Sequence, residues 1–131
     1  MLQIGLLGAG RIGKLHAQTI ASHAKTRLAA VADIYEPAAA ALASRYDAMC
    51  KDSDEIINDR TIDAVVIASS TDTHADFIEQ ACQAGKAVFC EKPVALDLGR
   101  ARSCQRAVLG MDQSIMIGFN RRFDPNFSAL K

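Results

Sequence analysis

Three glycines near the start of the chain have the spacing of a phosphate-binding loop. They are Gly8, Gly10 and Gly13 of segment 8–13 (Gly-Ala-Gly-Arg-Ile-Gly), which follows the apolar segment 3–7. Gly8 permits a tight turn out of a strand, Gly10 lets the main chain approach a pyrophosphate, and Gly13 lets a helix pack closely on the strand. The start of that helix adds unpaired N–H groups and the positive end of its dipole. The segment therefore predicts a site for the pyrophosphate of a dinucleotide.

Asp33, twenty residues after Gly13, is expected to select the cofactor. A carboxylate at the end of the second strand can accept hydrogen bonds from the adenosine ribose hydroxyls, and it repels a 2′-phosphate. The next two residues, Ile34 and Tyr35, provide no arginine to offset that repulsion. The pattern favours NAD over NADP, and the alternative is that Asp33 only caps the following turn.

Two side chains lie inside the glycine loop. Arg11 could approach the pyrophosphate or could simply be solvated, and the sequence leaves both alternatives open. Ile12 is apolar, so we expect it to pack against the cofactor or the sheet.

A lysine at the exit of a later strand is the strongest candidate for catalysis. Lys92 follows the apolar run 87–90 and precedes Pro93, whose fixed φ limits how far the lysine can move. Its ammonium would point across the nicotinamide side of the cleft, where it could hydrogen-bond a substrate hydroxyl. Glu91 could pair with Lys92 or bind a ribose. The alternative for both residues is an ion pair at the surface.

Further polar residues follow other expected strands, where an open parallel sheet binds its ligands. Ser69, Ser70 and His74 come after strand 63–68, and residues 120–122 (Asn-Arg-Arg) come after the last strand. Polar residues that several connections bring to one sheet edge are unlikely to be only solvated loops. His74, in the first turn of a helix, could instead satisfy a loop carbonyl.

An α/β fold is predicted to position these residues, because strand-like apolar runs alternate with helical patterns. The expected strands are 2–8, 28–32, 63–68, 87–90 and 114–118. The expected helices begin near Ile12, Pro37, Ser53, His74, Asp97 and Pro125. Ile12, Leu15, Thr19 and Ile20 would form one face of the first helix. The pattern is typical of a doubly wound parallel sheet.

Composition indicates one globular domain with no preference for a charged partner. The chain has 131 residues, half of them apolar, and a formal net charge of zero. We therefore expect neither nucleic-acid binding nor membrane association, and no apolar run is longer than a strand needs. The four cysteines are Cys50, Cys82, Cys90 and Cys104. Their spacing matches no metal site, and we expect buried, reduced thiols in a cytoplasmic protein.

Four motifs in this order resemble the N-terminal half of the Gfo/Idh/MocA oxidoreductases, and most closely those members that oxidise inositol. They are the glycine loop with its strand-ending acid, Ser69-Ser70 separated by three residues from His74, residues 88–93 (Val-Phe-Cys-Glu-Lys-Pro), and residues 117–124 (Ile-Gly-Phe-Asn-Arg-Arg-Phe-Asp). Many members carry Thr-Pro where this chain has Ser69-Ser70, and the inositol dehydrogenase-like members tolerate the change.

The resemblance implies roles that spacing alone does not provide. Lys92 would be the catalytic residue that hydrogen-bonds the reacting hydroxyl. Glu91 and residues 69–74 would line the nicotinamide ribose, with Asn120 and Arg121 near the nicotinamide. The implied reaction is NAD-dependent oxidation of a secondary hydroxyl of an inositol or related polyol.

Family members are longer than this chain, and the resemblance assigns their substrate pocket, general base and usual homo-oligomer contacts to a second domain. It implies that residues 1–119 are a Rossmann dinucleotide-binding domain and that residues 120–131 begin a truncated substrate domain. Two alternatives remain: an isolated NAD-binding module without catalysis, and an S-adenosylmethionine-binding domain.

Overall fold

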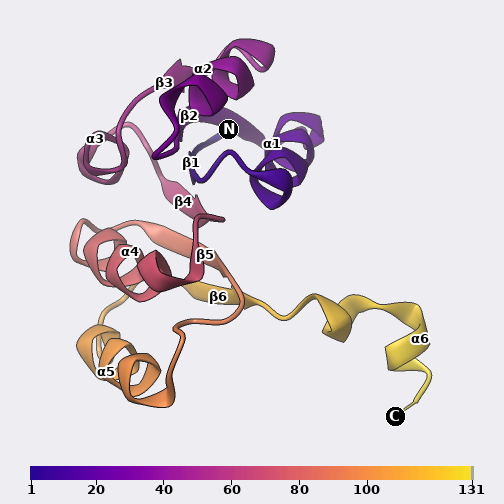
Figure 1. The fold of residues 1–131 in the computed structure, drawn as a ribbon, viewed down its shortest axis with the longest axis vertical. Coiled ribbons are helices and arrows are strands. Elements are labelled where there is room, and N and C mark those ends of the chain that lie inside the picture. The colour runs from indigo at the N-terminus through magenta and orange to yellow at the C-terminus, as the bar shows by residue number, and fades with distance from the viewer. Residues whose placement is uncertain (131) are drawn as a thin grey trace.

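The computed structural model describes residues 1–130, which form a parallel sheet with helices on both faces (Figure 1). The sheet order is β3-β2-β1-β4-β5-β6, and every neighbouring pair is parallel. The strands are β1 (Leu2–Leu7), β2 (Thr26–Ala32), β3 (Met49–Cys50), β4 (Ala64–Ile67), β5 (Ala87–Glu91) and β6 (Ile115–Gly118). The predicted doubly wound α/β fold is confirmed.

The helices divide between the two faces of the sheet. They are α1 (Arg11–Ser22), α2 (Glu36–Arg45), α3 (Ser53–Asn58), α4 (Thr71–Gln83) and α5 (Leu98–Val108), followed by the short η1 (Asn120–Phe123) and α6 (Pro125–Ser128). One apolar core joins α1 and α2 to the sheet, and the other joins α3, α4 and α5 to its opposite face. Figure 1 shows α3, α4 and α5 to the left of the strands and α1 to the right.

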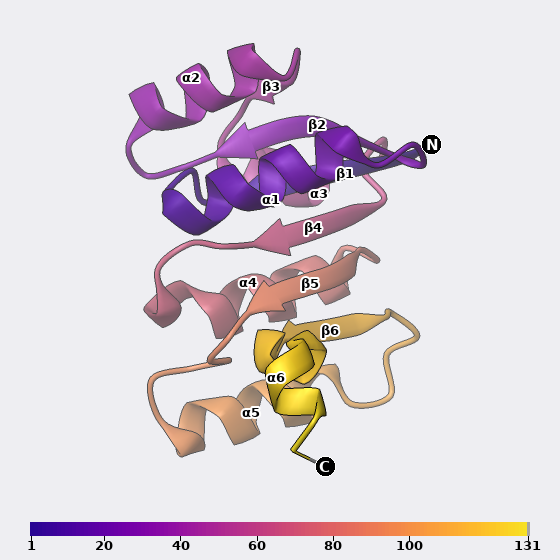
Figure 2. The ribbon, with the colours of Figure 1, turned by 90° about the vertical axis from the view of Figure 1, so that its right-hand side faces the viewer.

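The chain reverses its direction of winding between β1 and β4, which are hydrogen-bonded neighbours. From β1 it builds outward through β2 to β3, and then it returns to build β4, β5 and β6 on the other side. Loops leave the carboxyl ends of β1 and β4 in opposite directions at such a point, so a crevice opens there for a ligand. Figure 2 shows the arrowheads of β2, β4 and β5 pointing to the same edge.

The helices begin and end at residues whose types explain the boundary. Asp97 caps α5 by accepting a hydrogen bond from the N–H of Arg100, and Asp124 caps α6, with Pro125 in its first turn. Gly85 follows α4 with a φ of 78°, a left-handed conformation that favours glycine at a helix end.

The buried face of α1 differs in part from the expected one. The buried face of α1 consists of Gly13, Ala17 and Ile20, whereas Leu15 and Thr19 are exposed. The first turns of α1 lie close to the sheet and bury the small Gly13 and Ala17, whereas Leu15 is exposed. The start of α3 at Ser53 agrees with the expectation, and its N-cap is Asp52, which forms a reciprocal capping box with the N3 residue Glu55.

The edge strand β3 was not predicted, because a two-residue strand carries no periodicity. Its Cys50 is exposed, which corrects the expectation that all four cysteines are buried, while Cys82, Cys90 and Cys104 are buried free thiols. None of the helices within residues 1–130 is long and apolar enough to cross a membrane.

The cysteines lead to a prediction about thiol reactivity. Burial raises the pKa of Cys82, Cys90 and Cys104, that of Cys90 to about 12, so their reactive thiolates are scarce at pH 8. A thiol reagent with a coloured product should therefore titrate one thiol quickly in the native chain, and the other three only after unfolding. Cys50→Ser should abolish the fast phase, and more than one fast thiol in the native chain would contradict the burial pattern.

Candidate functional site

The glycine loop has the geometry that each of its glycines was predicted to provide. Gly8 has a φ of 109°, and a Cβ there would overlap the main chain of Ala68. A Cβ at Gly13 would overlap the carbonyl oxygen of Gly8, so α1 can start this close to β1 only without one. Gly10, in contrast, is exposed and has no heavy atom within 4 Å of its would-be Cβ. The open space at Gly10 is where a pyrophosphate could approach the main chain.

The first turn of α1 is free to bind an anion. Gly10 is its N-cap and provides no side-chain hydrogen bond, and the first turn contains no acidic residue. The first N–H groups of an α-helix have no partner inside the helix, and the helix dipole adds partial positive charge there. Arg11 is exposed at this end and Ile12 is partly buried. This arrangement fits a dinucleotide pyrophosphate.

Asp33 follows β2 and joins two neighbouring segments. One carboxylate oxygen accepts a hydrogen bond from the N–H of Ala9 at 2.7 Å, and the other accepts one from the N–H of Tyr35 at 2.8 Å. The residue thus caps the following turn, as the alternative stated, and also braces the glycine loop. Because each carboxylate oxygen can accept more than one hydrogen bond, both can still accept from ribose hydroxyls.

A cleft of about 420 Å³ lies at the carboxyl edge of β1, β2 and β4 and contains several predicted site residues. Its lining includes Gly8, Asp33, Ser69, Ser70, Thr73 and Phe77. The hydroxyls of Ser69 and Thr73 lie 2.7 Å apart, and Thr73 donates a hydrogen bond to the carbonyl of Ser70. The start of α4 therefore holds a preformed polar loop beside the glycine loop.

His74 is buried behind this loop and does not face the cleft. It is 2% exposed, with Nδ1 2.8 Å from the carbonyl oxygen of Pro93 and Nε2 3.0 Å from that of Ser69. Both ring nitrogens are therefore engaged by the main chain. His74 could therefore affect cofactor binding only indirectly, through the two loops whose carbonyls it contacts.

Glu91 forms a contact that the sequence did not suggest. Its carboxylate lies 2.7 Å from Nε2 of His16 on α1, and both side chains are mostly buried. Of the two alternatives for Glu91, the ion pair with Lys92 does not form, because α1 lies close enough to the end of β5 for His16 to bind Glu91. His16 lies three residues after Gly13, almost one helical turn further along α1, and that position was the only available signal.

Lys92 stands at the carboxyl end of β5 with its side chain exposed. Among residues 1–130, no carboxylate lies within ion-pair distance of its ammonium. The peptide bond between Lys92 and Pro93 is cis. The ammonium is therefore free to bind an oxygen of a ligand at this edge of the sheet.

Asn120 and Arg121 lie outside the cleft. They belong to η1, which packs on α6 and buries no residue, and the Arg121 guanidinium lies 5.0 Å from the centre of the Phe127 ring. Figure 1 shows this C-terminal segment extending away from the sheet. The predicted roles of both residues near a nicotinamide stay predictions.

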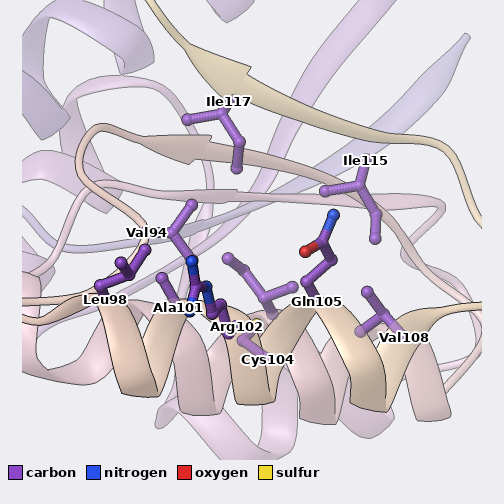
Figure 3. A pocket seen from close by; sticks show the side chains of 10 residues that line it. Val94, Leu98, Ala101, Arg102, Cys104, Gln105, Val108, Ile115 and Ile117 are labelled. Atoms are coloured by element: carbon purple, nitrogen blue, oxygen red, sulfur yellow. The ribbon is translucent and has the colours of Figure 1, made fainter.

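A second hollow, of about 350 Å³, lies between α5 and β6 (Figure 3). Ile115 and Ile117 point into it from β6, and Cys104 and Val108 face them from α5. Its lining is mostly apolar, with Arg102 and Gln105 as its polar members, and it shares none of the predicted site residues of the carboxyl edge. In the described part of the chain, no group of three or more His, Cys, Asp or Glu side chains could hold a metal ion.

The sheet order, the glycine loop, the free helix start and the strand-ending acid together define a Rossmann dinucleotide-binding domain. Residues 2–119 match the family model described as "Oxidoreductase family, NAD-binding Rossmann fold". The chain belongs to this family, the Gfo/Idh/MocA oxidoreductases that its motifs resemble.

Individual relatives agree with the family match. The chain is 51% identical to an inositol 2-dehydrogenase of Rhizobium meliloti over 130 residues. It superposes with a TM-score of 0.91 on a myo-inositol dehydrogenase from Corynebacterium glutamicum (41% identity, 99% of this chain, 39% of that one). It also superposes with a TM-score of 0.91 on a scyllo-inositol dehydrogenase from Lactobacillus casei with bound NAD(H) and scyllo-inositol, at 31% identity and the same coverage. The match covers 99% of this chain but only 39% of the Rhizobium enzyme.

The glycine geometry predicts opposite outcomes for two alanine substitutions. Gly13→Ala should lower the free energy of unfolding by about 2 kcal/mol or more, because its Cβ overlaps Gly8. Gly10→Ala should cost at most about 1 kcal/mol, because its Cβ meets open space and only the helix cap is weakened. Gly10→Ala should nevertheless weaken NAD binding about tenfold or more, because that space is needed by the pyrophosphate.

Urea unfolding and NAD titration of the two variants and the unsubstituted chain would measure both effects. A Gly10→Ala chain that binds NAD normally would show that the pyrophosphate lies elsewhere.

Proposed function

We propose that this chain is the NAD-binding part of an enzyme that oxidises a secondary hydroxyl of an inositol or related polyol. The observation that carries the proposal is the exposed Lys92, which has no ion-pair partner among residues 1–130 and follows β5 at the sheet edge where the glycine loop and Asp33 lie. The 51% identity to an inositol 2-dehydrogenase over nearly the whole chain supports the choice of substrate.

NAD bound in this cleft would supply the acceptor for the hydride that leaves the carbinol carbon. The residues of this chain would bind and orient it: the first turn of α1 at the pyrophosphate, Asp33 at the adenosine ribose, and Ser69 and Ser70 along the cleft. Lys92 would donate a hydrogen bond to the reacting hydroxyl and stabilise the negative charge that develops there as the O–H proton leaves.

The proton acceptor is proposed to lie outside the residues described. His74 is buried between two carbonyls, His16 is bound to Glu91, and His23 caps the far end of α1. The chain spans about two fifths of the length of the Rhizobium enzyme, so a substrate pocket and base from a second domain fit the difference.

We place the domain boundary near residue 119, with residues 1–119 as the Rossmann domain and 120–131 as the start of the substrate domain. β6 ends at Gly118, and the described helical turns after it, η1 and α6, bury none of their residues. We further propose homo-oligomer assembly through that second domain and a cytoplasmic location, which the three buried free thiols support.

The alternative that the length difference favours is an NAD-binding module without catalysis of its own. To separate the two, the chain is titrated with NAD, and inositol-dependent NADH formation is measured for the chain alone and for a fusion enzyme. The fusion enzyme joins this chain to the remainder of the Rhizobium relative.

We expect the chain alone to bind NAD and form no NADH, and the fusion enzyme to form NADH. NADH formation by the chain alone would contradict the assignment of the substrate pocket to a second domain. An NAD-bound fusion enzyme that oxidises no polyol would contradict the proposed reaction. Tighter binding of S-adenosylmethionine than of NAD would overturn the cofactor assignment.

Replacing Lys92 should separate chemistry from cofactor binding. In the fusion enzyme, Lys92→Met should lower kcat by about 100-fold or more, because the developing alkoxide loses its electrostatic partner. The Kd for NAD should change less than about twofold. Lys25→Met, at an exposed lysine beyond the far end of α1, is the matched control and should alter neither quantity. Unchanged turnover in Lys92→Met would exclude the lysine from the reaction.

Asp33 should set the preference for NAD over NADP. Asp33→Asn removes the negative charge that repels a 2′-phosphate and weakens one of two main-chain hydrogen bonds. We expect NAD affinity to fall about 5- to 30-fold, the equivalent of about 1–2 kcal/mol, and the ratio of the two Kd values to move toward NADP. Asp47→Asn, at a fully exposed carboxylate, is the control. An unchanged ratio would mean that Asp33 serves only the turn and the loop.

A further inference from the structure

Within residues 1–130, no side chain forms an ion pair with Lys92, so its position depends on its neighbours in the chain. The ammonium ends a flexible side chain and, within residues 1–130, has no carboxylate in ion-pair range. Glu91 precedes it and Pro93 follows it, and each of these two residues is held by a different histidine.

The preceding residue is held from one side of the sheet. Nε2 of His16 lies 2.7 Å from the Glu91 carboxylate, and the two side chains are 20% and 24% exposed. The His16 ring also packs edge-on against Phe89, with ring centres 5.2 Å apart. Gly118 of β6 lies against the same carboxylate, since a Cβ there would come within 3.3 Å of its other oxygen. Glu91 is thus enclosed by α1, β5 and β6.

The following residue is held from the other side. The buried His74 lies on α4, and its Nδ1 is 2.8 Å from the carbonyl oxygen of Pro93. Its Nε2 is 3.0 Å from the carbonyl oxygen of Ser69, in the loop that lines the cleft. A neutral imidazole carries one N–H and can donate to only one of these carbonyls, whereas an imidazolium donates to both. Either way, the ring bridges the cofactor cleft and the segment after Lys92.

We propose that His16 and His74 are positioning residues that fix the segment 91–93 and thereby the place of the Lys92 ammonium. The proposal rests on the proposed function of Lys92 as the group that binds the reacting hydroxyl. His16 belongs to the helix whose first turn would bind the pyrophosphate, and His74 contacts the loop that lines the cleft. The two histidines therefore set the distance from Lys92 to the cofactor site.

Amide side chains provide matched variants, because a glutamine nitrogen takes the place of Nε2 and an asparagine nitrogen that of Nδ1. His16→Gln keeps a donor for Glu91 and His16→Asn does not. His74→Asn keeps a donor for Pro93, whereas His74→Gln keeps one for Ser69. We therefore expect glutamine at position 16 and asparagine at position 74 to preserve the positioning of Lys92.

The first test measures order in the chain itself, without any activity. Backbone ¹⁵N relaxation should give the Lys92 N–H an order parameter near about 0.85 in the unsubstituted chain and in His16→Gln. In His16→Asn it should fall toward about 0.6. Equal order parameters in the two variants would overturn the role of His16. Melting curves check that both variants fold, and the partly exposed His16 keeps the test valid if a variant of the buried His74 does not fold.

The second test uses kinetics of the fusion enzyme. A misplaced ammonium should lower kcat about 10- to 100-fold in His16→Asn and His74→Gln, with KM for NAD changed little. His16→Gln and His74→Asn should retain more of the activity. If the histidines had a purely structural role, glutamine and asparagine would lower stability alike at each position, and the better-tolerated amide would not differ between positions 16 and 74.

The two proposals fail in different ways. In the Lys92→Met background, His16→Asn should cause no further loss of kcat, because its effect acts through Lys92. If Lys92→Met has no effect, the proposed function fails. If Lys92→Met lowers kcat while the histidine variants retain it, only the positioning role is overturned.

Discussion

The close approach of α1 to β1 is the constraint on which the rest of this domain depends. Gly13 stands against the carbonyl of Gly8, in a space that admits no Cβ, and this contact sets where the helix starts. From that start, the free N–H groups face the open space at Gly10, and His16 reaches Glu91 on β5. A Cβ at residue 13 would push α1 away from β1, and this shift would disturb both the open space at Gly10 and the contact between His16 and Glu91. The proposed phosphate site and the proposed support of Lys92 therefore share one structural origin.

The parallel sheet provides the second condition, because all of its strands end at one edge. Asp33, Ser69 and Lys92 follow β2, β4 and β5, so residues about sixty positions apart in the chain share that edge. The reversal of winding between β1 and β4 opens the cleft between their loops. The lining of that cleft combines the Asp33 carboxylate and the hydroxyls of Ser69, Ser70 and Thr73 with apolar side chains such as Phe77.

The proposed role of Lys92 combines an exposed side chain with chain neighbours that are held in place. Its own side chain is free to bind a ligand, while its chain neighbours are fixed by two histidines from helices on opposite faces of the sheet. These contacts fix the main chain next to Lys92 and leave its ammonium available to a ligand. The same reasoning separates this lysine from Lys86, whose buried ammonium is bound by two main-chain carbonyls.

Local patterns in the sequence determined the glycine loop, most strands and helices, the parallel sheet and the strand-ending acid, because each depends on residues close together in the chain. They also identified Lys92 as unusual, from its place between a strand and a proline. Only the tertiary structure decided the partners. The sequence left Glu91 to pair with its neighbour Lys92 or to bind a ribose, yet it binds His16, 75 positions away, because the fold brings α1 within side-chain reach of the end of β5. His74 could have faced the cleft, and packing turned it inward between two carbonyls. Such contacts depend on where helices cross strands, which no local spacing encodes.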